Sequence, residues 1–118
     1  MKPKYFEIAK KMSYKADYCH KIGAVVVYKN RPIGFGFNQP FKTNTKSNNP
    51  FHTTHAELSA ILNAGDCRGA SIYIYREVKD GTKANSKPCK FCQQLIKQAG
   101  IKKVYYTDNG QYKEWLNV

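Results

Sequence analysis

The spacing of apolar positions changes along the chain between the period of helices and that of strands. Apolar residues recur every three to four positions from Pro3 to Tyr18, which predicts an amphipathic helix with lysines on its outer side. Residues Gly23–Lys29 are apolar and largely β-branched, and Asn30-Arg31-Pro32 is typical of a turn. Ile33–Phe37 is therefore expected to return as the second arm of a hairpin. The polar segment Gln39–Thr54 then predicts a long loop.

The second half repeats the alternation of helix and strand. It predicts a helix over His55–Ala64, a strand over Ala70–Arg76, a polar loop over Val78–Asn85, a helix that ends at Gly100 and a strand over Ile101–Thr107. Ser86 is the expected N-cap of the later helix, with Pro88 in its first turn. The tail, Asp108–Val118, is expected to form a short edge strand or a helix.

The resulting order α-β-β-α-β-α-β predicts an α/β fold. The last strand–helix–strand unit should be a right-handed crossover between parallel strands. An N-terminal hairpin plus parallel C-terminal strands makes a mixed β-sheet flanked by helices. The 118 residues contain no repeat and no linker, so we expect residues 1–118 to form a single domain.

Three residues at predicted helix starts are candidate zinc ligands: His55, Cys89 and Cys92. The two cysteines are three positions apart, so one helical turn brings both sulfurs to the same side. A site with three protein ligands leaves a position for water, whereas structural zinc sites close with four. Glu57, two residues after His55, is placed to serve as a general acid and base for that water.

Each motif also has an ordinary structural interpretation. Thr54-His55-Ala56-Glu57 fits the capping box of a helix start, which would account for Glu57 without catalysis. A lone Cys-x-x-Cys is compatible with redox-active or simply buried thiols. The coincidence of both motifs at helix starts, with Pro88 before Cys89, favours the metal site. Cys67 and the Cys19-His20 pair lack this spacing and are expected to be structural, and His52 to be a solvated loop residue.

The pattern His55-Ala56-Glu57 with Pro88-Cys89-Lys90-Phe91-Cys92 resembles that of the zinc-dependent nucleoside, nucleotide and nucleic-acid deaminases. The resemblance covers nearly the whole chain, since Gly23–Val27 and Ile33–Asn38 match the family's first two strands. The chain departs from many relatives at Lys87, where they carry a serine before the proline. The deaminase family implies a cytidine-deaminase-like fold.

The resemblance also implies residue roles. Zinc would be held by His55, Cys89 and Cys92, and Glu57 would carry protons to the ring nitrogen and the leaving amine. The backbone of Ala56 and Lys87 would hold the pyrimidine edge, with Asn38 on the sugar hydroxyl. Either Tyr105 or Tyr106 would lie beside the base, and Tyr106 is the one expected at the rim.

The composition bears mainly on the substrate and the compartment. Twenty basic and eight acidic side chains give a net charge of +12, which favours a partner that carries phosphate. The chain has no apolar run long enough for a membrane span and no signal-like N-terminus, and its four cysteines are typical of a reducing compartment. We therefore expect a cytoplasmic protein without membrane contact, of host cytoplasm if the gene is viral.

Three functions stay open. The first is deamination of a cytosine nucleotide such as dCMP to dUMP, with Lys42 or Lys46 neutralising the phosphate. The loop after Asn38 resembles deoxycytidylate-type and phage enzymes more than tRNA adenosine deaminases. The second is a single-stranded DNA or RNA cytosine deaminase, favoured by the charge and by nine tyrosines. The third is a non-catalytic zinc-stabilised binding module. A homo-oligomer is compatible with each.

Overall fold

The computed structural model describes residues 3–15, 21–40, 53–77 and 81–115. The helices are α1 (Pro3–Ser13), α2 (Ala56–Ala64) and α3 (Lys90–Gln98). The strands are β1 (Ile22–Tyr28), β2 (Arg31–Phe37), β3 (Gln39–Pro40), β4 (Thr53–Thr54), β5 (Ser71–Arg76), β6 (Lys103–Asp108) and β7 (Gln111–Trp115). None of the helices in these ranges is long and apolar enough to cross a membrane.

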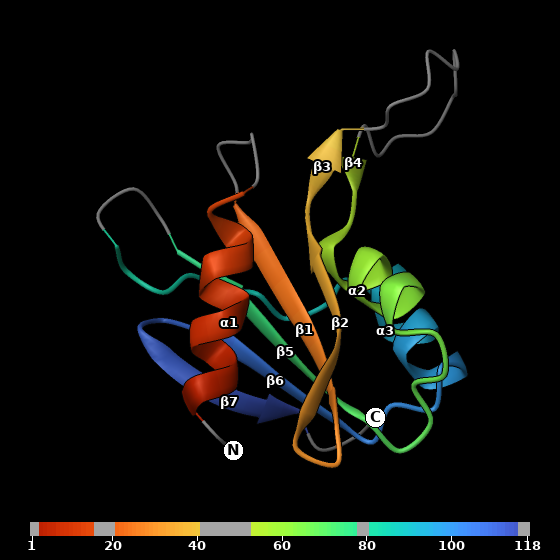
Figure 1. Cartoon of the computed structure of the whole chain (residues 1–118). Coiled ribbons are helices and arrows are strands. Elements are labelled where there is room, and N and C mark those ends of the chain that lie inside the picture. Colours follow the sequence, from red (N-terminus) through yellow and green to blue (C-terminus); the bar gives the residue numbers. More distant parts are fainter. Residues whose placement is uncertain (1–2, 16–20, 41–52, 78–80, 116–118) are drawn as a thin grey trace.

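Within the described residues, one mixed sheet has the strand order β2-β1-β5-β6-β7. β5 and β6 are parallel and are joined through α3, whereas the other neighbouring strands run antiparallel. Helix α1 covers one face of the sheet, and α2 and α3 cover the other (Figure 1). The predicted α/β fold, with an N-terminal hairpin and a parallel pair toward the C-terminus, is confirmed.

Alternate residues of the central strands serve the two faces, as the period of a strand requires. In β1, Val25 contributes to the core under α1, and Val26 to the core under α2 and α3. In β5, Tyr73 lies on the α1 side and Ile74 on the other. The apolar character on both faces of these strands, visible in the sequence, thus reflects burial between two helical layers.

Two glycines let the helices approach the sheet closely. A Cβ added at Gly36 of β2 would lie 2.9 Å from the Ser59 Cβ and closer still to backbone atoms of Ala56 and Ala60 in α2. On the opposite face, a Cβ at Gly23 would collide with the backbone of α1. The start of α2, where the candidate residues His55 and Glu57 lie, is therefore positioned by direct contact with the edge of the hairpin.

The hairpin turn differs from its prediction. It lies at Lys29 and Asn30, whose positive φ angles of 48° and 64° give the left-handed turn that matches strand twist. Arg31 and Pro32, expected in the turn, instead begin β2. Pro32 is tolerated there because β2 is an edge strand and needs no donor on its outer side.

The ends of other elements also differ from the sequence reading. Helix α1 ends at Ser13, not Tyr18 (residues 16–20 lie outside the described ranges). The expected loop Gln39–Thr54 begins and ends in the paired strands β3 and β4, which form a separate two-stranded sheet. The tail forms an edge strand, β7, after a turn at Asn109 and Gly110.

Ser86 is not a helix cap, and the prediction that it caps α3 is wrong. The N-cap is Cys89, and Ser86 is buried between the ends of β5 and β6. Its hydroxyl accepts a hydrogen bond from the Thr107 N–H at 2.7 Å, and contacts the Ile74 carbonyl at 3.0 Å and the Thr107 hydroxyl at 2.9 Å. A polar residue is needed at position 86, because an apolar one would leave the buried N–H and hydroxyl of Thr107 without this hydrogen-bond partner.

Candidate metal centre and pocket

The start of α2 and the start of α3 lie side by side and bring His55, Cys89 and Cys92 together. His55 Nδ1 is 3.7 Å from Cys89 Sγ and 3.2 Å from Cys92 Sγ, and the three donor atoms lie within 4.8 Å of one another. His55 and Cys89 are the N-caps of the two helices, and Cys92 is in the first turn of α3. Residues 34 or more positions apart in the sequence thus form one cluster.

The donor set and its spacing fit zinc. Zinc ligated by thiolate at about 2.3 Å and by imidazole at about 2.0 Å in tetrahedral geometry separates N from S by about 3.5 Å. The two N–S distances in the structure, 3.2 and 3.7 Å, lie on either side of that value. Two thiolates with an imidazole are ligands that favour zinc over calcium or magnesium. Three protein ligands leave room for a fourth, exchangeable one.

Glu57 lies in the first turn of α2, next to the donors, and only 6% of it is exposed. Burial raises the pKa of the Glu57 carboxyl, while its own backbone N–H, the His55 ring and the Cys92 thiol act against that rise. Burial also raises the pKa of the Cys92 thiol, with Glu57 and Cys89 adding to the effect. A bound divalent cation reverses this for the sulfur, because it stabilises the thiolate.

The capping-box interpretation of Glu57 does not hold. Helix α2 is capped by His55 in extended backbone geometry, not by Thr54, and its N-cap makes no side-chain hydrogen bond to the helix. A capping box requires the N-cap side chain and the residue three positions later to bond each other's N–H groups. Glu57 therefore owes its place to the cluster rather than to a local cap.

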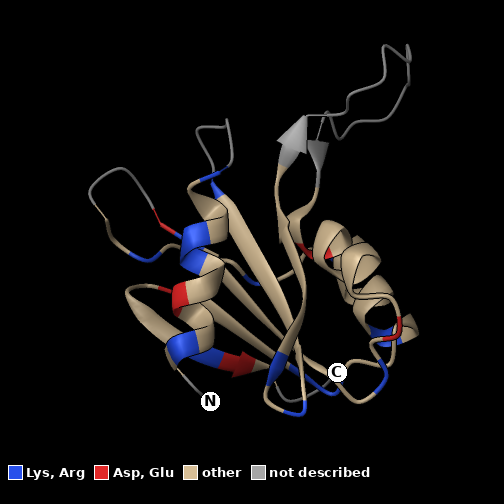
Figure 2. Ribbon diagram, in the orientation of Figure 1, with Lys and Arg blue, Asp and Glu red and all other residues tan. Residues whose placement is uncertain are grey.

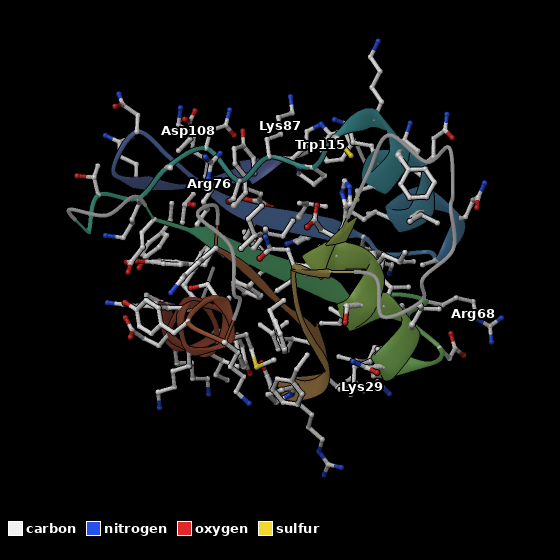
Figure 3. All side chains as sticks on the ribbon, turned by 90° about the horizontal axis from the view of Figure 1, so that it is seen from above. Lys29, Arg68, Arg76, Lys87, Asp108 and Trp115 are labelled. Atoms are coloured by element: carbon white, nitrogen blue, oxygen red, sulfur yellow. The ribbon has the colours of Figure 1, made fainter. Side chains whose placement is uncertain are left out.

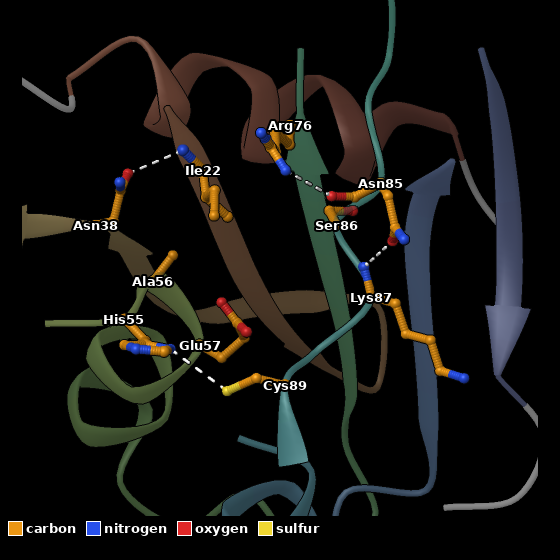
Figure 4. A pocket seen from close by; sticks show the side chains of 10 residues that line it. All are labelled: Ile22, Asn38, His55, Ala56, Glu57, Arg76, Asn85, Ser86, Lys87 and Cys89. Atoms are coloured by element: carbon orange, nitrogen blue, oxygen red, sulfur yellow. Dashed lines mark hydrogen bonds between the residues drawn. The ribbon is translucent and has the colours of Figure 1, made fainter. Parts of the chain in front are cut away.

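A pocket of about 370 Å³ adjoins the cluster. It lies between the starts of α2 and β1, the end of β5 and the segment before α3 (Figure 4). Its volume falls within the usual range of small-molecule sites, about 300–1,000 Å³. The residues that line it are Ile22, Asn38, His55, Ala56, Glu57, Arg76, Asn85, Ser86, Lys87 and Cys89.

Three residues expected from the family resemblance to hold substrate line this pocket. Asn38 is buried, and its side-chain oxygen accepts a hydrogen bond from the Ile22 N–H at 2.9 Å. Ala56 is the first residue of α2, where backbone N–H groups have no acceptor within the helix. Lys87 contributes its backbone, because its side chain leads away from the pocket and its ammonium lies 5.8 Å from the Trp115 ring centroid (Figures 3 and 4).

Tyr106 is half-buried against the core under α2 and α3 and is not among the residues that line the pocket. Its proposed place at the rim stays a prediction. Its neighbour Tyr105 is buried on the α1 side, where its ring stacks on Tyr73 at 4.6 Å. Cys67 is buried, as expected of a structural thiol. The remaining sequence candidates, Cys19, His20, Lys42, Lys46 and His52, lie outside the described residues.

Sequence reasoning missed Arg76, Asn85, Ser86 and Ile22 as parts of the pocket. Arg76 ends β5, and the segment 84–87 runs beside it because the Ala84 N–H donates to the Arg76 carbonyl. One signal was available. Ligands of open α/β sheets gather at the carboxyl ends of parallel strands, and Arg76 is the last residue of such a strand.

A mixed sheet that places two cysteines, a histidine and a buried carboxylate beside one pocket has the features of a metal-dependent hydrolase. The family model for the cytidine and deoxycytidylate deaminase zinc-binding region matches residues 2–108, and the chain belongs to this family. The metal of the cluster is accordingly zinc.

Relatives within the family differ in substrate. The chain is 30% identical over 112 residues to a tRNA-specific adenosine deaminase of Buchnera aphidicola, covering 93% of this chain and 66% of that one. It is 30% identical over 122 residues to a deoxycytidylate deaminase of Pongo abelii, covering 88% and 63%. A dCMP deaminase of cyanophage S-TIM5, solved with dCMP and dUMP, is 28% identical with a TM-score of 0.66, covering 90% and 82%. The chain thus spans less than two thirds of the length of these two curated relatives.

Proposed function

We propose that this chain catalyses the zinc-dependent hydrolytic deamination of cytosine in a free nucleotide, converting dCMP to dUMP. The observation that carries the proposal is that the pocket and the metal cluster have residues in common. His55 and Cys89 belong both to the metal cluster and to the lining of the pocket of about 370 Å³, and Glu57 lines the same pocket. A base bound in this pocket therefore lies against the metal donors and the carboxylate. The deoxycytidylate deaminases among the relatives add support for the substrate class.

Zinc held by His55, Cys89 and Cys92 would supply Lewis-acid activation of water near neutral pH. Glu57 would accept a proton from the attacking water and deliver protons to the ring nitrogen and the departing amine. Water oxygen bonds to the amino-bearing carbon, the carbon–nitrogen bond breaks, and ammonia leaves with a carbonyl in its place. The low exposure of Glu57 keeps this proton transfer away from bulk solvent.

The other residues of the pocket would orient the base. The Ala56 N–H and the Lys87 carbonyl are backbone groups, so they can read a pyrimidine edge whatever their side chains are. The Lys87 N–H donates to the Asn85 side chain at 2.8 Å, and the Pro88 carbonyl accepts from the Gln93 side chain at 2.8 Å. These two bonds fix the backbone on both sides of the Lys87 carbonyl. Asn38, held by Ile22, would reach the sugar hydroxyl.

A substrate panel tests the proposal. Purified chain is assayed for ammonia release from dCMP, deoxycytidine, dCTP and a cytosine-containing oligonucleotide, with zinc content measured in parallel. We expect dCMP to be turned over best, with about one zinc per chain. Glu57→Gln is expected to retain zinc and to lower kcat by about 100-fold or more. Turnover of the oligonucleotide alone would contradict the nucleotide proposal.

The panel also separates the other two functions. A polynucleotide substrate is favoured by the charge of +12 and by the tRNA-specific relative. However, the lysines and arginines of the described residues lie on α1, on the β1–β2 hairpin and on several other segments, and they do not gather in one stripe (Figure 2). If no substrate is turned over and Glu57→Gln changes nothing but thermal stability, the chain is a zinc-stabilised binding module.

A further inference from the structure

The end of the pocket away from the metal cluster carries a positively charged residue that sequence reasoning did not consider. Arg76 is the last residue of β5 and lines the pocket together with Asn38 and Asn85. In Figure 4, His55 and Cys89 lie at one end of the pocket, Arg76 and Asn38 lie toward the other, and Glu57 lies between them. A ligand with its base at the metal end therefore extends toward Arg76.

The structure holds Arg76 firmly at this place. Its backbone N–H donates to the Thr107 hydroxyl at 3.2 Å, and its carbonyl accepts from the Ala84 N–H at 2.8 Å. Thr107 is fully buried and is bonded in turn to Ser86. The guanidinium donates from Nη1 to the Asn85 carbonyl at 3.3 Å. Such anchoring lowers the conformational entropy that a ligand contact must overcome.

Among the side chains that line the pocket, Arg76 gives its end of the pocket a positive charge, which suits an anion. Of the other charged side chains that line the pocket, Glu57 is buried beside the metal donors, and the Lys87 ammonium lies over Trp115, away from the pocket. A guanidinium carries five N–H donors in a planar fork, so it can hold the Asn85 carbonyl and an oxygen of a ligand at once. This fork matches the oxygens of phosphate better than an ammonium does.

We propose that Arg76 is the residue that selects substrates carrying a phosphate on the sugar, and that it does so by binding the phosphate oxygens while the base lies at the metal end. The inference rests on the proposed deamination of a free nucleotide and assigns to a residue of the described pocket the phosphate recognition that the sequence pointed to in Lys42 or Lys46. Arg76 is thus a specificity-determining residue, and it takes no part in the proton transfers of Glu57.

The test compares dCMP with deoxycytidine, which lacks the phosphate, in the wild-type chain and in Arg76→Gln and Arg76→Lys. For Arg76→Gln, kcat/KM for dCMP is expected to fall by about 10- to 100-fold, the range for a hydrogen bond to a charged group. The value for deoxycytidine should stay within about twofold. Arg76→Lys keeps the charge without the fork, so an intermediate loss is expected.

Arg68→Gln is the matched control. Its side chain is 83% exposed and paired with Asp66, far from Arg76 in Figure 3. The variant removes the same charge without touching the pocket, so the ratio of the two substrates should not change. If Arg76→Gln does not fold, as judged by thermal melting, Arg76→Lys alone decides the outcome through that ratio.

Equal losses for dCMP and deoxycytidine, or no loss for dCMP in either Arg76 variant, would overturn the inference. Failure of the proposed function gives a different result, since the wild-type chain then deaminates neither compound. In that case, calorimetric binding of dCMP and deoxycytidine replaces the kinetic readout. Phosphate-dependent binding that Arg76→Gln abolishes supports the role of Arg76, and binding that ignores the phosphate refutes it.

Discussion

Replacing Gly36 with alanine should disturb the metal centre from a distance, through the contact between β2 and α2. The new Cβ would lie 2.9 Å from the Ser59 Cβ, whereas ordinary contact begins at 3.4 Å, and it would be closer still to the backbone of Ala56 and Ala60. Helix α2 therefore has to move by about 1 Å, because the backbone atoms of Ala56 and Ala60 cannot yield as the end of a flexible side chain would. His55 and Glu57, at the start of this helix, move with it.

The expected magnitudes follow from this displacement. Overpacking of this kind costs about 1–3 kcal/mol of the free energy of unfolding. For a chain of 118 residues, that corresponds to a melting temperature lower by about 4–12 °C. A misplacement of about 1 Å at a catalytic group costs about 100-fold in rate, so kcat is expected to fall by up to about 100-fold.

Gly23→Ala is the matched control for this prediction. It introduces the same methyl group against the backbone of Ala9 and Ser13 in α1, on the opposite face of the same sheet. Its loss of thermal stability should be similar, but α1 carries none of the metal donors. Zinc affinity, measured by competition with a chelator, and kcat at a temperature where all variants are folded are the readouts. Only Gly36→Ala should lower them. Equal effects of both variants, or a fully active Gly36→Ala chain, would refute this account.

Three further predictions concern the metal, the buried hydroxyls and a tyrosine. Cys92→Ser should reduce zinc from about one per chain to almost none, and a chelator should then lower the melting temperature of the wild type but not of the variant. Thr107→Val should cost about 1–3 kcal/mol in denaturant unfolding, because it leaves backbone partners buried without an acceptor or donor. Thr107→Ser, which keeps the hydroxyl, should cost about 0.8 kcal/mol, and a reversed order would contradict the hydrogen-bond explanation. The pKa of Tyr14 is raised from 10.0 to about 12, mainly by the hydrogen bond to Glu77. Burial and the negative charge of the Glu77 carboxylate act on this pKa in the same direction. Since that pKa is raised in the folded state, stability should fall as the pH rises from 10 through about 12, and Glu77→Gln should flatten this fall in thermal melts.

The metal donors could be predicted from the sequence because their chemistry is local. Cys89 and Cys92 are three positions apart, so spacing alone indicated that both sulfurs lie on one side of a helical turn. Glu57 was a candidate because it follows His55 by two residues at the start of the other helix. The central strands could also be predicted from the sequence, since burial between two helical layers makes them apolar on both faces. These features need no knowledge of how distant segments meet.

The pocket wall opposite the metal could not be predicted in the same way. The segment 84–87 has a polar sequence typical of any loop, and its place depends on Ser86 meeting Thr107, a residue 21 positions away. A serine or a threonine in a sequence gives no indication of which distant residue its hydroxyl will bond. Arg76 likewise reads as the ordinary charged end of a strand, and its role depends on Thr107 and Asn85 holding it beside the pocket.

The wrong cap assignment at Ser86 and the rejected capping box at Thr54 have a common physical origin. Serine and threonine are strong N-caps, so Thr54 and Ser86 were natural candidates for the starts of α2 and α3. In the structure, both N-cap positions belong to metal donors, His55 and Cys89, and neither makes a side-chain hydrogen bond to its helix.

Each helix thereby forgoes a local stabilisation of about 1 kcal/mol. A zinc ion held by His55, Cys89 and Cys92 would replace both caps at once, because it would tie the two helix starts together. It would also stabilise the thiolates, which the positive ends of the helix dipoles favour as well. Local rules of helix formation therefore fail at the two positions where this chain binds its metal. Such a conflict between local preference and structure is what a functional site produces.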